Sequence, residues 1–236
     1  MFSPELFRFF VRQHLLRCRI FMNGITEMLH QCDLGVGAIL HDVGKMWVPT
    51  EVLNKPGRLT DEEFAVMKKH TEYGHELLAR QPELSFLVAH CAFQHHERIN
   101  GTGYPRGLGG EEMHLFAKII SVADVYDALV MNRPYKSGMS PSDAMEFLFS
   151  NVGSHFEIDI VSQFSRKVSM YPLGTQVTLS DGREAVVVNL HDSVPNRPIV
   201  RILGDDPAKM EDVDLARTLN LTIVKSGDVT ILESID

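Results

Sequence analysis

The sequence is short of basic residues and has no long apolar run. Its 31 aspartates and glutamates outnumber its 23 lysines and arginines, which gives a net charge of -8 at pH 7. This balance argues against a general DNA-binding surface, because phosphate backbones are held mainly by lysine and arginine. No segment approaches the roughly 20 consecutive apolar residues that a membrane-spanning helix needs, so we expect no transmembrane segment.

Cysteine is also scarce, with only Cys18, Cys32 and Cys91 in the chain. An odd number at irregular spacing suits reduced thiols in a cytosolic helical core better than a disulfide framework or a zinc cluster. The N-terminus contains Glu5 and Arg8, and no small-residue cleavage site follows, so we do not expect a signal peptide. These features predict a cytoplasmic protein.

Apolar spacing and turn residues predict helices from residue 4 to about 167. Thr60 and the three acidic residues after it form a capping box that should start a helix, and Ser140 should cap another that has Pro141 at its first position. A buried stretch of small residues leads into His41 and Asp42. The expected helices cover about residues 4–30, 33–42, 60–80, 82–96, 111–131 and 157–167, with one more starting at Pro141.

After Pro172 the sequence predicts short strands at 176–179, 184–190, 198–203 and 220–224, the first two joined by a hairpin at Asp181 and Gly182. The expected fold class is therefore mainly α with a small C-terminal β appendage, divided into a helical domain at 1–168 and a β-rich extension at 169–236. We interpret the extension as a structural cap or a homodimer contact in preference to a ligand sensor.

Histidine is the anomaly in the composition, because six of the 11 histidines lie between His41 and His96. A single helical histidine is more often a core residue than a ligand, but here histidines and aspartates recur on several predicted helices. Imidazole and carboxylate together suit iron, manganese, nickel or zinc. An ionised Asp42 on a buried helix would cost several kcal/mol unless a cation paired with it. The candidate ligands are His14, His41, Asp42, His70, His95, His96 and Asp124.

Four sequence blocks in this order are highly specific: His41–Lys45; Lys69–Gly74; His95–Arg98 with Gly101–Arg106; and Val122–Leu129 with Asn132–Lys136. They resemble the HD-GYP family, a branch of the HD-domain metal phosphohydrolases known as cyclic di-GMP phosphodiesterases. The resemblance implies an HD-domain helical bundle. The segment 171–180 is similar to the small β extension that often follows such domains.

The resemblance implies a site of two divalent metal ions, of which iron or manganese is favoured and nickel or zinc is an alternative. Asp42 would bridge the ions, with His41 and Asp124 on one of them. His70, His95 and His96 would bind the other. His14 would complete the first set, with His30 as a competitor for that role. Some members use a glutamate four residues before the first histidine for a third metal, and Phe10 occupies that position here.

Two metal ions suit phosphodiester hydrolysis, since they lower the pKa of a bridging water and clamp the phosphate for in-line attack. With Asp42, Lys45 is the expected catalytic residue, and it would hold a phosphate oxygen; a surface ion pair is the alternative. Arg133 and Lys136 are expected to hold the second phosphate of a cyclic substrate.

The loop 101–107 needs glycine where its backbone takes positive φ or approaches a ligand closely. Tyr104 in this loop should face the cleft or a partner, unless the loop is a purely structural turn. The resemblance links Gly103, Tyr104 and Pro105 both to substrate and to GGDEF-domain proteins. Glu97 is expected to orient a histidine.

The resulting hypothesis is hydrolysis of cyclic di-GMP to pGpG, and onward to GMP, by a metal-bridging hydroxide. Hydrolysis of another cyclic dinucleotide, such as cyclic GMP-AMP, is one alternative, because no base-reading residue is identified. A nucleotide-sensing or docking module with weak catalysis is another. A mononucleotidase is disfavoured by the glycine loop and by the block at 132–136.

Overall fold

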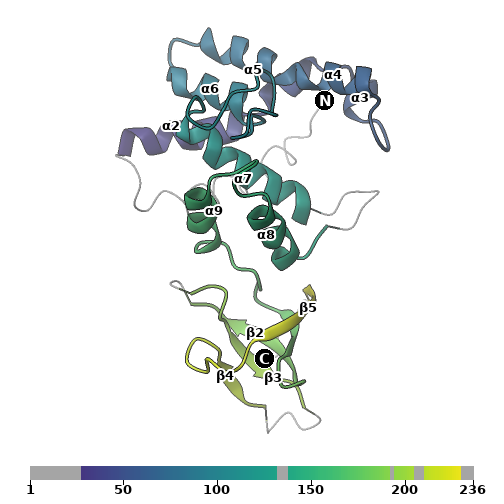
Figure 1. Cartoon of the computed structure of the whole chain (residues 1–236), viewed down its shortest axis with the longest axis vertical. Coiled ribbons are helices and arrows are strands. Elements are labelled where there is room, and N and C mark those ends of the chain that lie inside the picture. Colours follow the sequence, from purple (N-terminus) through teal and green to yellow (C-terminus); the bar gives the residue numbers. More distant parts are fainter. Residues whose placement is uncertain (1–27, 132–137, 192–193, 205–209, 230–236) are drawn as a thin grey trace.

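The computed structural model describes residues 28–131, 138–191, 194–204 and 210–229 (Figure 1). Within them, helices occupy the first part of the chain and a sheet the last. None of these helices combines the length and apolar character needed to cross a membrane. The helices are α2 (Met28–Leu40), the 3-10 helix η1 (Val43–Trp47), α3 (Thr50–Leu53), α4 (Asp61–Lys68), α5 (His70–Ala79), α6 (Phe86–Gln94), α7 (Leu115–Val130), α8 (Pro141–Ser150) and α9 (Ile158–Ser165).

The capping predictions are confirmed at two helix starts. Thr60 accepts a hydrogen bond from the backbone of Glu63, whose carboxylate accepts one from the backbone of Thr60. Ser140 accepts from the backbone of Asp143 at the start of α8, where Pro141 is the first helical residue. Both caps satisfy amides that a helix N-terminus leaves without partners.

Three expected helix boundaries are wrong. The helix expected at 60–80 is divided, because Lys69 donates to the carbonyl of Val66, three residues back, and the chain tightens there. Helix α6 starts at Phe86 instead of Pro82, since Ser85 supplies the N-terminal cap. Similarly, α7 starts only after His114, whose ring nitrogen accepts from the backbone of Phe116.

The helices pack around two clusters of buried side chains, with α5 on α6 in the smaller one and α2, α6, α7, α8 and α9 around the larger one. Members of the larger cluster include Leu34 of α2, Cys91 of α6, Ile120 of α7 and Phe164 of α9, each at most 2% exposed. Cys91 is free and buried, as expected. Cys32 is also free but exposed, so its predicted place in the core is wrong, because it faces out from α2.

The C-terminal part is a five-stranded antiparallel sheet in the order β4-β3-β2-β1-β5. It has its own core around Val177, Val187 and Leu215, and Figure 1 shows it as a separate layer beyond α8 and α9. The mainly helical fold with a small β appendage is thereby confirmed. The strands are β1 (Thr175–Leu179), β2 (Glu184–Asn189), β3 (Ile199–Ile202), β4 (Asp212–Asp214) and β5 (Ile223–Val229).

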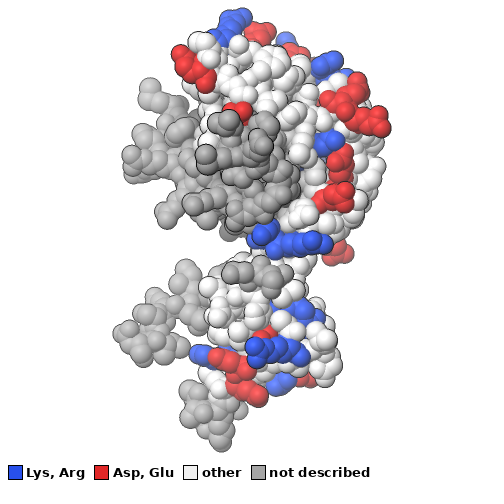
Figure 2. Space-filling model, turned by 90° about the vertical axis from the view of Figure 1, so that its left-hand side faces the viewer, with Lys and Arg blue, Asp and Glu red and all other residues white. Residues whose placement is uncertain are grey.

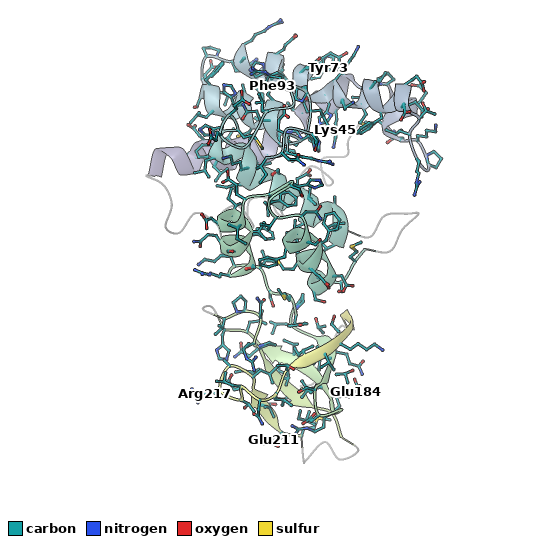
Figure 3. The ribbon with its side chains drawn as sticks, viewed as in Figure 1. Lys45, Tyr73, Phe93, Glu184, Glu211 and Arg217 are labelled. Atoms are coloured by element: carbon teal, nitrogen blue, oxygen red, sulfur yellow. The ribbon has the colours of Figure 1, made fainter. Side chains whose placement is uncertain are left out.

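Charge is mixed on the face shown in Figure 2, where basic and acidic side chains alternate over both the helical part and the sheet. Figure 3 places Lys45 in the helical part, together with Tyr73 and Phe93. Glu184 and Arg217 belong to the sheet part. Lys45 is of interest because it follows the His41 and Asp42 pair.

Candidate metal centre

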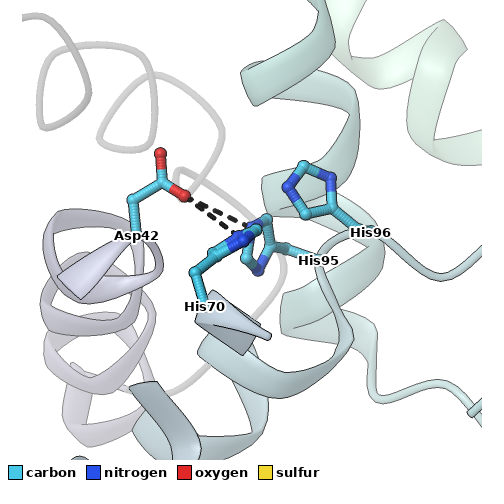
Figure 4. Close-up of side chains that lie close together, drawn as sticks. All are labelled: Asp42, His70, His95 and His96. Carbon is cyan, nitrogen blue, oxygen red and sulfur yellow. Dashed lines mark ion pairs between the residues drawn. The ribbon is translucent and has the colours of Figure 1, made fainter. Parts of the chain in front are cut away.

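Four parts of the helical region meet at Asp42. His41 and Asp42 lie between α2 and η1, His70 is the first residue of α5, and His95 and His96 directly follow α6. Asp124 comes from α7. Two groups of potential ligand atoms share Asp42, and within each group the atoms lie within 4.8 Å of one another. One group contains Asp42, His70, His95 and His96 (Figure 4), and the other contains His41, Asp42 and Asp124.

Close contact between η1 and α5 brings Asp42 to His70, and Gly44 makes this contact possible. A Cβ atom at position 44 would lie 1.8 Å from the carbonyl oxygen of His70 and 2.5 Å from the amide nitrogen of Gly74. Both neighbours are main-chain atoms that cannot rotate away. Glycine is therefore required two residues after Asp42, where the main chains of η1 and α5 touch.

The three most buried imidazoles are oriented by main-chain carbonyls. The Nδ1 atoms of His41 and His70 lie 2.8 Å and 2.7 Å from the oxygens of Ala38 and Met67. Nδ1 of His95 lies 3.0 Å from the oxygen of Ala92. A carbonyl oxygen only accepts, so each Nδ1 carries the proton, and in the neutral ring Nε2 offers its lone pair.

These Nε2 atoms converge on carboxylate oxygens at distances too long for charge-assisted hydrogen bonds. Nε2 of His70 and His95 lie 3.4 Å and 3.7 Å from Oδ1 of Asp42. Nε2 of His41 lies 3.4 Å from Oδ2 of Asp42 and 3.6 Å from Oδ1 of Asp124. Two ligands each about 2.1 Å from one ion are about 3.0–3.4 Å apart, so the spacing suits a shared cation.

Burial makes this arrangement costly without a cation. Nε2 of His70, Nε2 of His95 and Oδ1 of Asp42 are buried and have no hydrogen-bond partner among the described residues. The rings of His70 and His95 are each 1% exposed, whereas the side chains of Asp42 and Asp124 keep 21% and 22% exposure. The centre is therefore closed on its histidine side and accessible on its carboxylate side.

The pKa values show the same need for positive charge. Burial lowers the pKa of His41, but Asp42 and Asp124 outweigh it and raise that pKa to about 10, so without a metal ion Nε2 carries a proton whose place a bound cation would take. Burial raises the pKa of Asp42, but His41 and Lys45 hold it well below its usual range. Burial lowers the pKa of His70 to about 4, so its imidazole is neutral at pH 7, as a metal ligand must be.

The donor set therefore fits two divalent metal ions that share Asp42. The structure brings together six of the seven expected ligands: His41, Asp42, His70, His95, His96 and Asp124. His14, Arg133, Lys136 and the Phe10 position lie outside the described residues, as does the side chain of His30. The assignment of these residues to particular metals or phosphates remains a prediction.

Lys45 reaches the centre from η1. Its Nζ lies 2.5 Å from Oδ2 of Asp42, and its side chain is 33% exposed. The ion pair places one cation beside the carboxylate that both ligand groups share. Whether this amine also holds a phosphate oxygen remains a prediction.

The loop after His96 is fixed by Glu97, which is 2% exposed. Its carboxylate accepts hydrogen bonds from the backbone of Arg106 at 2.7 Å and of Leu108 at 2.9 Å. The expectation that Glu97 orients a histidine is therefore wrong; it orients this loop. A Cβ at Gly103 would lie 2.4 Å from the Cα of Glu97, so glycine is needed where the loop folds back.

Tyr104 is held against the centre by this loop. Its backbone donates to the carbonyl of His96 at 3.2 Å, and its ring lies 4.7 Å from the His96 ring at an interplanar angle of 30°. Burial raises the pKa of Tyr104, and the charges of Asp42 and Asp124 raise it further. Tyr104 therefore lies against His96, and its predicted role toward substrate or a partner remains a prediction.

Sequence reasoning missed Gln94 as a residue that supports the centre. It is 5% exposed, and its side-chain oxygen accepts from the backbone of His114 at 2.8 Å, which joins the end of α6 to the start of α7. The sequence gives no signal for this bond, because its partners are twenty positions apart. The bond fixes the residue directly before His95.

Family comparisons agree with this geometry. A family model described as HD domain matches residues 23–160, more than half of the chain, so the protein belongs to the HD domain family. A second, described as a KOW domain associated with HD domain, matches residues 176–234. An HDG"Y"P protein from Bdellovibrio bacteriovorus has a similar fold, with a TM-score of 0.54 and 24% identity over 66% of this chain and 51% of its own.

Curated relatives confirm the resemblance to the HD-GYP branch. A cyclic di-GMP phosphodiesterase of Pseudomonas aeruginosa is 39% identical over 78% of this chain and 45% of its own. The cyclic di-GMP phosphodiesterase response regulator RpfG of Xanthomonas campestris pv. campestris is 46% identical over 52% of this chain and 32% of its own. A 3'3'-cGAMP-specific phosphodiesterase of Vibrio cholerae is 42% identical over 52% of this chain and 24% of its own. The chain spans less than half the length of these relatives.

Proposed function

We propose that this protein is a metal-dependent phosphodiesterase that hydrolyses cyclic di-GMP to pGpG. The observation that carries the proposal is the convergence of three histidine Nε2 atoms on Asp42, with each Nδ1 already bonded to a main-chain carbonyl. Such an arrangement presents lone pairs to a cation and is costly otherwise. Relatives that are cyclic di-GMP phosphodiesterases support the substrate class.

In this proposal the two ligand groups hold two divalent ions, iron or manganese in preference to nickel or zinc. When bound, the ions supply hydroxide at neutral pH and neutralise the non-bridging phosphate oxygens. His41, Asp42 and Asp124 would hold one ion, and Asp42, His70, His95 and His96 would hold the other. His14 would complete the first set.

The remaining residues position the substrate. Lys45, beside Asp42, holds an oxygen of the reacting phosphate, and Arg133 and Lys136 hold the second phosphate. Tyr104 packs on His96 and closes one side of the centre. The loop that carries it is also the proposed contact for a GGDEF-domain protein.

The test is incubation of metal-reconstituted full-length protein with cyclic di-GMP and chromatographic separation of the products. We expect pGpG from the wild type and none from Asp42→Ala. Asp159→Ala, which removes an exposed carboxylate from α9, is the matched control and should remain active. A wild type that carries stoichiometric metal and binds the nucleotide without cutting it would identify a sensor instead.

A second candidate substrate is cyclic GMP-AMP, because relatives specific for 3'3'-cGAMP match the chain as well. Metal binding and phosphodiester cleavage would be the same for both substrates. Comparative kcat/KM values for the two cyclic dinucleotides, measured on one metal-loaded preparation, decide between them. A ratio above about 100 in favour of cyclic GMP-AMP would replace the first candidate.

A further inference from the structure

An aromatic ring and a lysine project from α4 beside the metal centre. Phe64 is 43% exposed, although its ring lies edge-on to that of Tyr104 at a centroid distance of 5.9 Å. Nζ of Lys68, one helical turn further on, lies 5.0 Å from the Phe64 ring centroid and 5.9 Å from that of Tyr104. Helical residues four apart share a face, so α4 presents both side chains together.

Lys68 differs from three other lysines of the helical part, each of which pairs with a carboxylate. Lys45 pairs with Asp42, Lys55 with Glu63 and Lys118 with Glu157. Lys68 has no carboxylate within ion-pair distance in the part of the chain that the structure describes. A cation thus stands over two aromatic rings in a protein of net charge -8.

Tyr104 connects this pair to the centre. One side of its ring neighbours Phe64, and the ring also lies 4.7 Å from His96, a potential metal ligand. Phe64 is therefore one aromatic ring removed from the ligands. This order of groups suits a nucleotide. Its phosphate would lie at the metal ligands, and its planar base, attached through the sugar, would reach the aromatic ring beside the cation.

We propose that Phe64 and Lys68 form a nucleobase subsite, in which a purine of the cyclic dinucleotide stacks on the Phe64 ring and Lys68 lies beside the base or its phosphate. The inference rests on the proposed function, to which it adds a base-binding residue. Stacking on an aromatic side chain tolerates any base and contributes about 1–3 kcal/mol per base, which corresponds to roughly 5- to 150-fold in affinity.

The first test measures, by titration calorimetry on the metal-loaded protein with Asp42 intact, the affinity of a phosphorothioate analogue of cyclic di-GMP that resists hydrolysis, so that no turnover interferes. We expect Phe64→Ala to weaken binding at least about tenfold and Phe64→Tyr to restore it. The matched control is Phe149→Ala on α8, because Phe149 has nearly the same exposure, 40%, and should leave affinity unchanged.

Inorganic phosphate provides a probe without a base. In the active enzyme, Phe64→Ala should raise KM for cyclic di-GMP with kcat within about threefold, while the inhibition constant of phosphate stays unchanged. Damage to the metal centre would instead change phosphate inhibition and kcat together. Lys68→Ala should show the same split with a smaller rise in KM.

A spectroscopic signature separates stacking from a structural role. Trp47, exposed on η1, is the single tryptophan of the sequence. In a Trp47→Phe background, Phe64→Trp should therefore report only on the subsite, and a stacked guanine should quench its fluorescence on titration with cyclic di-GMP. The same tryptophan at position 149 is the control and should not respond.

The outcomes separate the two proposals. Equal nucleotide affinity of Phe64→Ala and wild type in an active enzyme would overturn the subsite alone and assign Phe64 to a protein-docking surface. If the wild type binds the nucleotide but never cuts it, and Phe64→Ala binds it more weakly than the wild type, the subsite is supported and the phosphodiesterase is overturned. A wild type that neither binds nor cuts the nucleotide would overturn both.

Discussion

Histidine meets aspartate in both halves of this protein, but the two contacts differ. In the sheet, Nε2 of His191 lies 2.9 Å from Oδ1 of Asp214, which also accepts from the backbone of Ala216. In the helical half, the Nε2 atoms around Asp42 stay 3.4–3.7 Å from its oxygens. The contact in the sheet is a direct hydrogen bond. The contacts around Asp42 are longer and leave room for a cation between the nitrogen and oxygen atoms.

The difference lies in where each imidazole places its proton. Nδ1 of His41, His70 and His95 is bonded to a helix carbonyl, so Nε2 has no proton to give to Asp42 while the ring is neutral. Nε2 of His191 bonds directly to its carboxylate partner. A His–Asp contact thus favours a metal site when the other ring nitrogen already donates to a carbonyl and the Nε2–carboxylate distance is longer than that of a hydrogen bond.

The largest expected effect is that of Asp42→Ala, which removes the carboxylate shared by both ligand groups. We expect turnover of cyclic di-GMP to fall by about a thousandfold or more, because several kcal/mol of metal-ion catalysis would be lost. Metal content, measured by elemental analysis, should fall as well. Asp214→Ala in the sheet should change neither, and an active, metal-loaded Asp42→Ala protein would refute the centre.

Gly44→Ala should have the next largest effect, since its Cβ would lie 1.8 Å from the His70 carbonyl oxygen. Overpacking of this kind costs about 1–3 kcal/mol, or a Tm lower by about 3–10 °C. Displacement of η1 should also weaken metal binding by about tenfold. Gly204→Ala is the control, because no atom of the described residues lies within 4 Å of a Cβ there. Normal Tm and metal affinity in Gly44→Ala would show that η1 can shift without cost.

Glu97→Gln distinguishes the sequence hypothesis from the structural finding. If Glu97 fixes the Tyr104 loop, Glu97→Gln should raise KM for the nucleotide about tenfold and leave metal content unchanged. A tenfold rise corresponds to the cost of one poorly satisfied buried hydrogen bond. If it oriented a histidine, metal content would fall. Glu146→Gln, an exposed change on α8, controls for the lost charge and should resemble the wild type.

Local sequence signals predicted much of this molecule. The caps at Thr60 and Ser140, the hairpin at Gly182 and the ligand candidates all depend on neighbouring residues or on a specific motif order. The four blocks were sufficient to predict the residues that meet at Asp42. Short-range patterns and motifs can be identified without knowledge of the packing.

What escaped prediction depends on contacts between distant segments. Strand β4 (Asp212–Asp214) is short and acidic and exists because β3 offers it an edge. Glu97 bonds to amides nine and eleven positions away. Phe64 and Lys68 read as an ordinary helix surface until Tyr104, forty positions later, is placed beside them.

The smallest expected effect concerns the directly bonded pair in the sheet and its pH dependence. The hydrogen bond from His191 lowers the pKa of Asp214 below its usual value. The folded state therefore releases this proton more readily than the unfolded chain, so the stabilisation is present above about pH 4 and is lost as the pH falls through the folded pKa. Asp214→Asn should lower Tm by about 1–2 °C at pH 6, and its curve should converge with that of the wild type below pH 4.

Circular dichroism melts between pH 6 and pH 3, with and without EDTA, sharpen the contrast with Asp42. The Asp214→Asn difference should be independent of EDTA, since a direct hydrogen bond needs no cation. The Tm difference between wild type and Asp42→Asn should instead depend on metal, because only the wild type gains stability from binding it. An EDTA-dependent effect of Asp214→Asn would mean that the sheet pair also takes part in metal binding, and the distinction between the two His–Asp contacts would fail.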